Sequence, residues 1–139
     1  MSCPTCGEAG TVVAGASAEA TVGTVAAMVE RRPVVDCTRQ HGITPPEIVG
    51  EAMAAVDAAV PRARSRLLRD DACLDCRETL TMPVRRAERA VTVEPADGPV
   101  TTIHLDVPLT RCGSCGRDQV PSRSHEDLTV VIPALFAAH

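Results

Sequence analysis

Three copies of a Cys-x-x-Cys motif punctuate this sequence, and they constrain its fold more than any other feature. The motifs begin at Cys3, Cys73 and Cys112, and a seventh cysteine, Cys37, is followed by His41 with three residues between them. A Cys-x-x-Cys turn places two sulfur atoms on one side of a tight loop, and two such turns supply the corners of a tetrahedral metal site. The spacing therefore predicts small units built around metal ions.

The candidate ligands divide into an amino-terminal set and a carboxyl-terminal set. The carboxyl-terminal set combines two complete Cys-x-x-Cys motifs, as in a zinc ribbon, while the amino-terminal set has three cysteines and needs a histidine as its fourth ligand. We expect a structural Zn²⁺ ion in each set, two in all, bound by Cys3, Cys6, Cys37 and His41 and by Cys73, Cys76, Cys112 and Cys115.

Other ligand arrangements stay open at this stage. His125 or a water molecule could replace His41, and a water would leave an open coordination position of the kind that catalytic zinc sites use. The motifs at Cys3 and Cys112 are each followed by glycine and could instead share one iron ion, as in rubredoxins. Rubredoxins have an aromatic core, whereas this chain has a single aromatic residue, Phe136, so zinc is favoured.

Disulfide bonds are the rival use of the cysteines. Met1 leads directly into the first motif without the apolar segment of a signal peptide. No apolar run approaches the ~20 residues of a membrane span. We therefore expect a cytoplasmic protein, and in that compartment Cys-x-x-Cys pairs favour metal or redox chemistry.

The composition argues for two very small units rather than one ordinary domain. The apolar side chains of the 139 residues are mostly Ala and Val, which bury little area each, so a unit of ~60 residues would be marginal without a metal. We expect a small metal-stabilised α+β fold of two tandem zinc ribbons, each a short antiparallel sheet, joined by a helix. The expected divisions are residues 1–61 with the helix, an arginine-rich connector at 62–72, and a β-rich ribbon at 73–139.

The first half contains two strand-like segments and one strong helix signal. Residues 11–14 and 33–36 are expected strands, and residues 15–27 have no clear pattern. Thr44, Pro45 and Glu47 form the start of a helix, with Thr44 as N-cap and Glu47 completing a capping box. Apolar spacing continues this helix to Val60, where Pro61 ends or kinks it, and it is expected to restart over residues 62–68 with Ala63 and Leu67 inward.

The second half is expected to be mostly β-structure. Residues 79–84, 90–94 and 100–107 are β-branched runs, with a turn at 95–99. His104 lies on the polar face of the third run, whose alternate residues are apolar. The C-terminal residues fit either a helix over 128–135 or a strand over 129–132 that ends at Pro133, and the strand is favoured.

Residues 73–118 resemble the YgiT-type zinc finger, the amino-terminal module of MqsA-like antitoxins. The features that carry this resemblance are Cys73-Leu-Asp-Cys76, the segment Ile103-His-Leu-Asp-Val-Pro108, and Cys112-Gly-Ser-Cys115-Gly116. The resemblance implies a small β zinc ribbon with all-cysteine coordination. Residues 1–60 resemble a more distant copy. In such antitoxins a helix-turn-helix domain binds operator DNA, and this sequence contains no recognisable domain of that kind.

Arginine supplies every basic residue other than histidine, and six arginines are candidates for partner binding. We expect Arg62, Arg66 and Arg69 to share a helical face, with Asp70 and Asp71 as neutralising neighbours, and the full set is Arg62, Arg66, Arg69, Arg85, Arg86 and Arg89. The net charge is −4, and thiolates with zinc would bring it to about −7. So acidic a chain is not a general polyanion binder.

The predicted function is a non-catalytic zinc-binding interaction module that acts as an adaptor or accessory subunit for another protein. The alternative is a nucleic-acid-binding regulator that uses the arginine-rich connector, with an enzyme or redox carrier as a third reading. The adjacent residues His125, Glu126 and Asp127 resemble a hydrolytic trio only in composition, because no nucleophile accompanies them. No membrane association is expected.

Overall fold

The computed structural model describes residues 2–39, 41–67, 69–80 and 84–137, and within these ranges the chain has the predicted α+β class. Its elements in chain order are β1 (Thr11–Ala14), β2 (Ala18–Val22), β3 (Val25–Val29), β4 (Pro33–Asp36), α1 (Pro46–Ala59), β5 (Arg85–Val93), β6 (Thr101–Arg111), β7 (Asp118–Gln119) and α2 (Ser122–Ala137). The strands predicted at 11–14 and 33–36 are confirmed as β1 and β4, which pair with each other.

A five-stranded antiparallel sheet forms the centre of the molecule. Its order is β2-β3-β6-β5, with the short β7 pairing with the end of β6. The pairing of β3 with β6 places Val29 opposite Ile103. One sheet is thus built from strands of both segments that the sequence divides at the connector.

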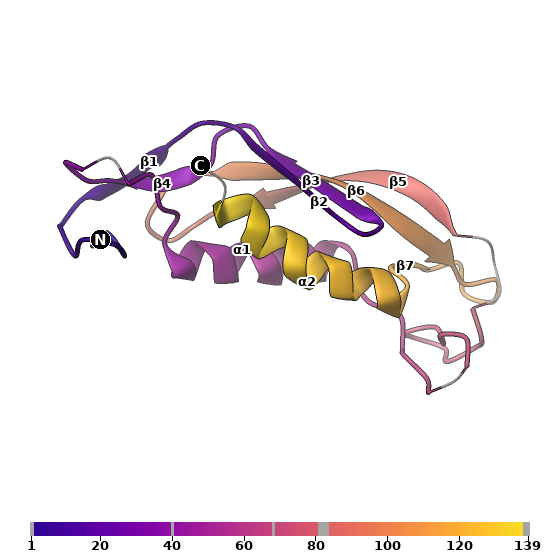
Figure 1. The fold of residues 1–139 in the computed structure, drawn as a ribbon. Helices are drawn as coiled ribbons and strands as arrows, with labels where there is room; N and C mark the ends of the chain where they lie inside the picture. Colours follow the sequence, from indigo (N-terminus) through magenta and orange to yellow (C-terminus); the bar gives the residue numbers. More distant parts are fainter. Residues whose placement is uncertain (1, 40, 68, 81–83, 138–139) are drawn as a thin grey trace.

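Both helices lie along the same face of this sheet, and the opposite face carries neither helix (Figure 1). Apolar side chains of the strands alternate toward the helices, as Ile103, Leu105 and Val107 do on β6. They pack against Val56 of α1 and Leu128 of α2 in a single core cluster. The predicted alternation of β6 is confirmed, since His104 on the other face is exposed.

Helix α1 begins where the sequence predicts, but by a different mechanism. Pro45 occupies the N-cap position, and no side-chain hydrogen bond caps the helix. The Thr44 hydroxyl donates instead to the Pro33 carbonyl at 2.6 Å, so the predicted capping box is wrong. Thr44 is buried and fastens the helix start to β4.

The predicted helix over residues 62–68 is wrong. Arg62 bridges Val120 and Arg64 bridges Ala72 by backbone pairing, and the Arg69 amide donates to the Arg66 carbonyl, so the connector begins extended and then turns back on itself. Leu67, predicted to face inward, is 88% exposed. Pro61 removes the amide needed to continue α1, and neighbouring chain segments then satisfy the extended backbone.

The favoured C-terminal strand is also wrong, because residues 122–137 form α2. Leu128, Val131, Ile132 and Leu135 follow the i, i+3, i+4, i+7 spacing of a buried helical stripe, and all four are fully buried. Pro133 lies inside the helix without ending it. Of the strand predicted at 79–84, residues 81–83 lie outside the described residues, and Thr79 forms only an isolated bridge.

Neither helix in the described part of the chain is long and apolar enough to cross a membrane.

Candidate metal centres

All three Cys-x-x-Cys motifs fold into the same tight knuckle. The amide of the first cysteine donates to the carbonyl five residues on, in the pairs Cys3 with Glu8, Cys73 with Glu78, and Cys112 with Arg117, at 2.8–3.0 Å. The amide of the residue after the second cysteine returns to the first cysteine's carbonyl. That residue has positive φ in each case: 71° at Gly7, 65° at Arg77 and 76° at Gly116. Arg77 holds a conformation that arginine rarely adopts, so local hydrogen bonding maintains the knuckle.

The second cluster brings four sulfur atoms together at the end of the sheet. The Sγ atoms of Cys73 and Cys115 lie 3.5 Å apart, and those of Cys76 and Cys112 lie 3.4 Å apart. All four ligand atoms lie within 4.8 Å of one another. A tetrahedral zinc–thiolate centre with bonds of ~2.3 Å has sulfur–sulfur edges of about 3.8 Å. The cluster could therefore hold a metal ion with little rearrangement.

Gln119 supports this cluster from the protein interior. The side chain is fully buried on β7. Its Nε2 donates to Cys73 Sγ at 3.3 Å, and its Oε1 accepts from the Leu74 amide at 2.7 Å. One side chain thus fixes both the sulfur and the backbone of the knuckle, as partners of metal ligands commonly do.

The electrostatic environment favours a thiolate at Cys73. Burial opposes ionisation there, but hydrogen bonds from Gln119 and from the amides of Cys76 and Asp75 lower the pKa to about 6. The Glu78 amide favours the thiolate at Cys76, yet the neighbouring Cys112 sulfur, burial and the remaining sulfurs raise its pKa to about 12. Four thiols this close cannot all ionise without a cation between them.

The first cluster joins the amino-terminal knuckle to the end of β4. His41 Nδ1 lies 3.4 Å from Cys3 Sγ and 3.5 Å from Cys37 Sγ. Together with Cys6, these ligand atoms fall within 4.8 Å of one another. The amide of Val35 on β4 donates to the Ile43 carbonyl, which turns the chain back so that the imidazole faces the sulfurs. This cluster could also hold a metal ion.

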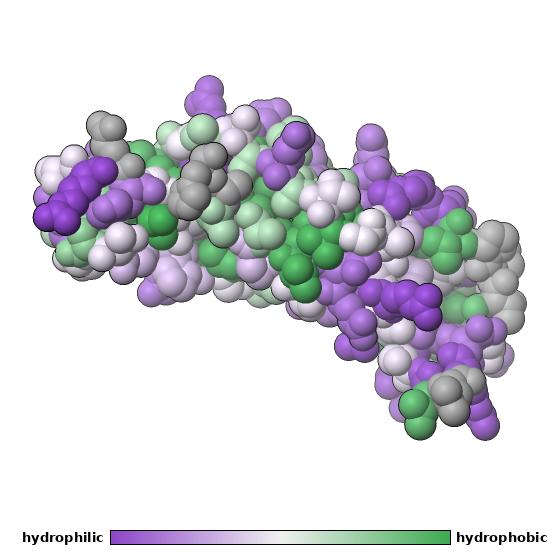
Figure 2. Space-filling view, viewed as in Figure 1, coloured by the Kyte–Doolittle hydropathy of each residue, from purple (hydrophilic) through white to green (hydrophobic). Residues whose placement is uncertain are grey.

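The clusters lie at opposite ends of an elongated molecule (Figure 1). One is beside the paired strands β1 and β4, and the other is beside the connector and β7. Strongly hydrophilic side chains gather around the second end (Figure 2). Beside the second cluster, Arg117 pairs with Asp75 at 2.6 Å, and Arg64 donates to the Leu74 carbonyl.

The structure does not bring together the alternative ligand sets or the His-Glu-Asp trio considered from the sequence. The motifs at Cys3 and Cys112 belong to different clusters, so they cannot share an iron ion. His125 bonds Asp57 on α1 through Nε2 at 2.8 Å and is not a member of the first cluster. Asp127 binds Thr24 instead, so the residues of the His-Glu-Asp trio diverge. None of the seven cysteines forms a disulfide.

The first three candidate partner-binding arginines lie in the connector, where the Arg69 amide donates to the Arg66 carbonyl in a turn. Because the connector is not helical, Arg62, Arg66 and Arg69 share no helical face, and that prediction is wrong. Arg66 donates to the Asp70 carbonyl and to the Thr79 hydroxyl.

The second arginine group occupies β5. Arg86 pairs with Asp106 on the uncovered face of the sheet. Arg85 and Arg89 converge with Arg111 on Asp118. The hydrogen bond from Arg111, together with all three positive charges, holds the pKa of Asp118 below its usual value although partial burial opposes this.

Sequence reasoning missed two residues that organise the second end of the molecule, Gln119 and Asp71. The Asp71 carboxylate accepts from the amide and hydroxyl of Ser122 at 2.7 Å and thereby caps α2. An amide side chain next to a knuckle is a signal that could have identified Gln119. Nothing local to residues 122–137 points to Asp71.

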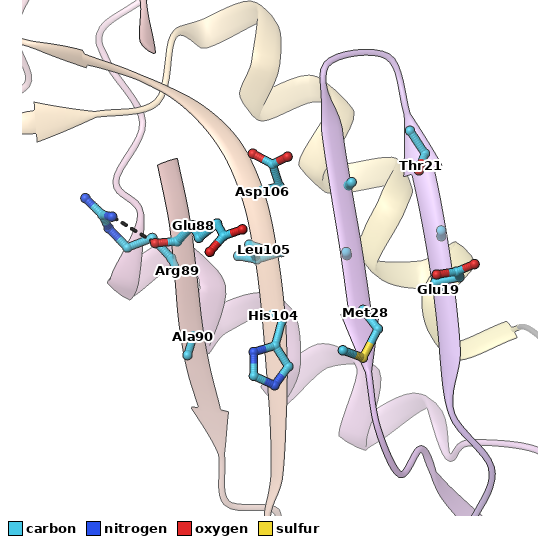
Figure 3. Close-up of a pocket in the computed structure, with 12 residues that line it drawn as sticks. Glu19, Thr21, Met28, Glu88, Arg89, Ala90, His104, Leu105 and Asp106 are labelled. Carbon is cyan, nitrogen blue, oxygen red and sulfur yellow. Dashed lines mark hydrogen bonds between the residues drawn. The ribbon is translucent and has the colours of Figure 1, made fainter. Parts of the chain in front are cut away.

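The sheet face opposite the helices forms a shallow hollow of about 530 Å³ (Figure 3). Its small side chains include Ala26 and Ala90, and Glu19, Glu88 and Asp106 surround them.

No family model, no curated protein and no solved structure matches this chain.

Proposed function

We propose that this chain is a non-catalytic, cytoplasmic zinc protein whose metal ions hold a sheet in shape for binding another protein. The observation that carries this proposal is the pair of four-residue clusters, one beside the two-stranded β1–β4 sheet and the other beside β7 of the five-stranded sheet. Each cluster offers four protein ligands, so a tetrahedral ion bound there would have no free position for a substrate. That is the signature of a structural rather than a catalytic zinc site.

The choice of zinc follows from the donor atoms. Four thiolates in one cluster, and three thiolates with one imidazole in the other, are donor sets that suit tetrahedral Zn²⁺, and reduced thiols persist in the cytoplasm. The resemblance of residues 73–118 to a YgiT-type zinc finger points in the same direction. It concerns the knuckles and the segment between them, so it supports the zinc ribbon and not an antitoxin role.

The choice of a protein partner follows from the surface. Both helices cover one face of the sheet, and the opposite face offers small apolar side chains within a ring of charges. The chain carries a net charge of −4, so it is not a general binder of polyanions, and this favours a protein over a nucleic acid as the partner.

The metal assignment is tested by counting zinc in three forms of the protein. Native mass spectrometry of the wild type should give two bound zinc ions, while His41→Ala and Cys112→Ser should each lose the ion of one cluster only. A colourless protein is expected, whereas visible absorption would indicate iron. If His41→Ala keeps two ions with unchanged affinity, His41 is not the fourth ligand.

The partner assignment is tested separately, by affinity capture from the native lysate. A stoichiometric protein partner should copurify with the zinc-loaded chain and not with protein treated with a chelator. Absence of any stoichiometric protein in both samples argues against the interaction role. Fluorescence anisotropy with duplex DNA and structured RNA at ~50 mM salt tests the nucleic-acid alternative, because phosphate contacts are strongest at low salt.

A further inference from the structure

Strand β5 forms one edge of the central sheet, and this edge is the basis of the inference. The strand pairs with β6 along all nine of its residues. Among the described residues no strand pairs with its other side. An unpaired edge presents a row of amides and carbonyls that can accept a further strand.

One contact shows which backbone groups point outward. Arg89 donates through Nη1 to the Glu88 carbonyl at 2.9 Å, and in Figure 3 this guanidinium lies on the side of β5 away from β6. The amide and carbonyl of one strand residue point to the same side, and the side alternates along the strand. The outward groups therefore belong to Arg86, Glu88, Ala90 and Thr92.

The charge of this edge is uneven. Arg85 and Arg89 stand four residues apart on one face of β5, about 13 Å along the strand. Arg111 joins them around Asp118, so three guanidinium groups share one carboxylate. The side chains of these arginines are 40–57% exposed, which leaves donors free to bind another acid. Charged side chains normally protect an edge strand from indiscriminate pairing.

The other end of β5 is apolar. Val91 and Val93 are buried on the same face as the two arginines. Beyond them a hollow of about 400 Å³ opens between β5 and α1, lined by small apolar side chains such as Ala54 and Ala55 and also by Glu51 and Glu94. The edge thus changes along its length from a cationic half to a half that accepts small apolar side chains.

We propose that β5 binds an extended acidic segment of the partner protein as an added strand of the sheet. The partner strand carries two carboxylates four residues apart, facing Arg85 and Arg89, and small apolar residues facing Val91 and Val93. Backbone hydrogen bonds to β5 provide affinity, and the side chains provide selectivity, as in other cases of strand addition. This inference rests on the proposed function, because it names the surface and the chemistry of that partner.

Other occupants of this edge fit less well. A second copy pairing β5 with itself about its centre would put Arg89 opposite Arg89, and directly opposed like charges are destabilising. The other sheet edge, β2, has five residues and carries Glu19, so it has no charge to attract an acidic strand. A nucleic acid would use the guanidinium groups but not the backbone edge.

The test uses zinc-loaded protein and a synthetic peptide, Val-Thr-Val-Thr-Glu-Thr-Ala-Thr-Glu, which in antiparallel pairing with β5 places its glutamates opposite Arg89 and Arg85. A second peptide replaces both glutamates with lysine, and a third replaces the fourth residue with proline and keeps both glutamates. Backbone amide hydrogen exchange is followed by NMR. The acidic peptide should slow exchange at Glu88, Ala90 and Thr92, whose amides point outward, and leave the β2 amides unchanged. The lysine and proline peptides should protect none of these amides.

Two variants separate backbone pairing from charge. Ala90→Pro removes an outward amide without removing a hydrogen bond to β6, so it should fold and abolish binding. Arg85→Glu combined with Arg89→Glu should weaken binding by about tenfold or more, because two opposite-charge pairs become like-charge pairs. Arg31→Glu makes the same type of charge change at an exposed arginine outside β5 and should leave binding unchanged. Zinc content and circular dichroism verify that each variant is folded.

The outcomes distinguish this inference from the proposed function. A captured partner that still binds both β5 variants would overturn the strand addition and leave the interaction role intact. Three other results would also overturn the strand addition. These are equal protection by the acidic and lysine peptides, protection of the β2 amides, and competition for the arginines by an oligothymidylate that protects no amides. Loss of the partner in both β5 variants, with retention in Arg31→Glu, would support it.

Discussion

The replacement of Gln119 by leucine tests whether the buried amide supports the second metal centre. Leucine keeps the approximate volume of the side chain but removes its donor to Cys73 Sγ and its acceptor for the Leu74 amide. A hydrogen bond to a charged group contributes about 1.5–3 kcal/mol. Since 1.4 kcal/mol is a factor of ten, the zinc affinity of this centre should fall about 10- to 100-fold.

The pH dependence of zinc release provides a second readout of the same substitution. The hydrogen bond from Gln119 helps to lower the pKa of Cys73 from 9.0 to about 6. The folded protein therefore favours the Cys73 thiolate. The stability that this lowered pKa contributes to the folded protein is lost as the pH falls from 9 through about 6. Without Gln119 the pKa should rise, so protons should displace zinc from the second centre at a higher pH.

The assay is competition of zinc-loaded protein with a chromogenic chelator over a series of pH values. The first centre is the internal control, because His41 and its cysteines have no hydrogen bond to Gln119. Gln119→Glu is the matched variant, since it keeps the shape and replaces the donating amide with a carboxylate. Unchanged affinity and an unchanged release pH in Gln119→Leu would show that the amide has no role at the centre.

Three further substitutions test the packing around the helices. Gly23→Ala should destabilise the fold by about 1–3 kcal/mol, because φ is +55° and the new Cβ would lie 2.4 Å from the Asp127 carboxylate; the denaturant midpoint checks this. Arg32→Met should cost about 1.5–3 kcal/mol in the same assay, because the buried guanidinium donates to the Phe136 carbonyl at 2.8 Å. His125→Ala should cost less than about 1 kcal/mol and should leave zinc stoichiometry unchanged.

Matched variants accompany these predictions. Gly50→Ala lies on exposed α1 surface with no atom near its new methyl group, so it should stabilise the fold by about 0.5–1 kcal/mol. Arg31→Met alters an exposed arginine and should have little effect. If Gly50→Ala destabilises the fold as much as Gly23→Ala, the steric reasoning is contradicted. If Arg31→Met and Arg32→Met lower the stability of the fold equally, the buried hydrogen bond of Arg32 does not have the proposed role.

The metal clusters and much of the β-structure could be predicted because their signals are local. A Cys-x-x-Cys knuckle sets its own geometry within six residues, and the alternation from Thr102 to Val107 reports one buried face of a strand. The spacing between Cys37 and His41 likewise identified the fourth member of the first cluster. In each case the signal lies within a few neighbouring residues, although the clusters join Cys3 to His41 and Cys73 to Cys115, 38 and 42 positions apart.

The remaining features depend on partners that are distant in the sequence. Helix α2 has its cap in Asp71, which is 51 positions from Ser122, so the capping rule applied locally found nothing. The turn at Gly23 and Thr24 is held by Asp127, and the alanine-rich strands beside it give no strong pattern of their own. The start of the connector runs extended because Arg62 pairs with Val120, which lies far along the chain.

The pairing of β3 with β6 has a consequence for how the chain folds. The ribosome releases β3 long before β6, and until β6 emerges the β2–β3 hairpin has an unpaired edge and an uncovered apolar face. Contacts between such distant segments slow folding, because the intervening chain must first be ordered. The amino-terminal knuckle can form its cluster early, since all its members precede residue 42. We therefore expect folding to begin at this end and to be completed only after β6 is synthesised, with truncated chains prone to aggregate.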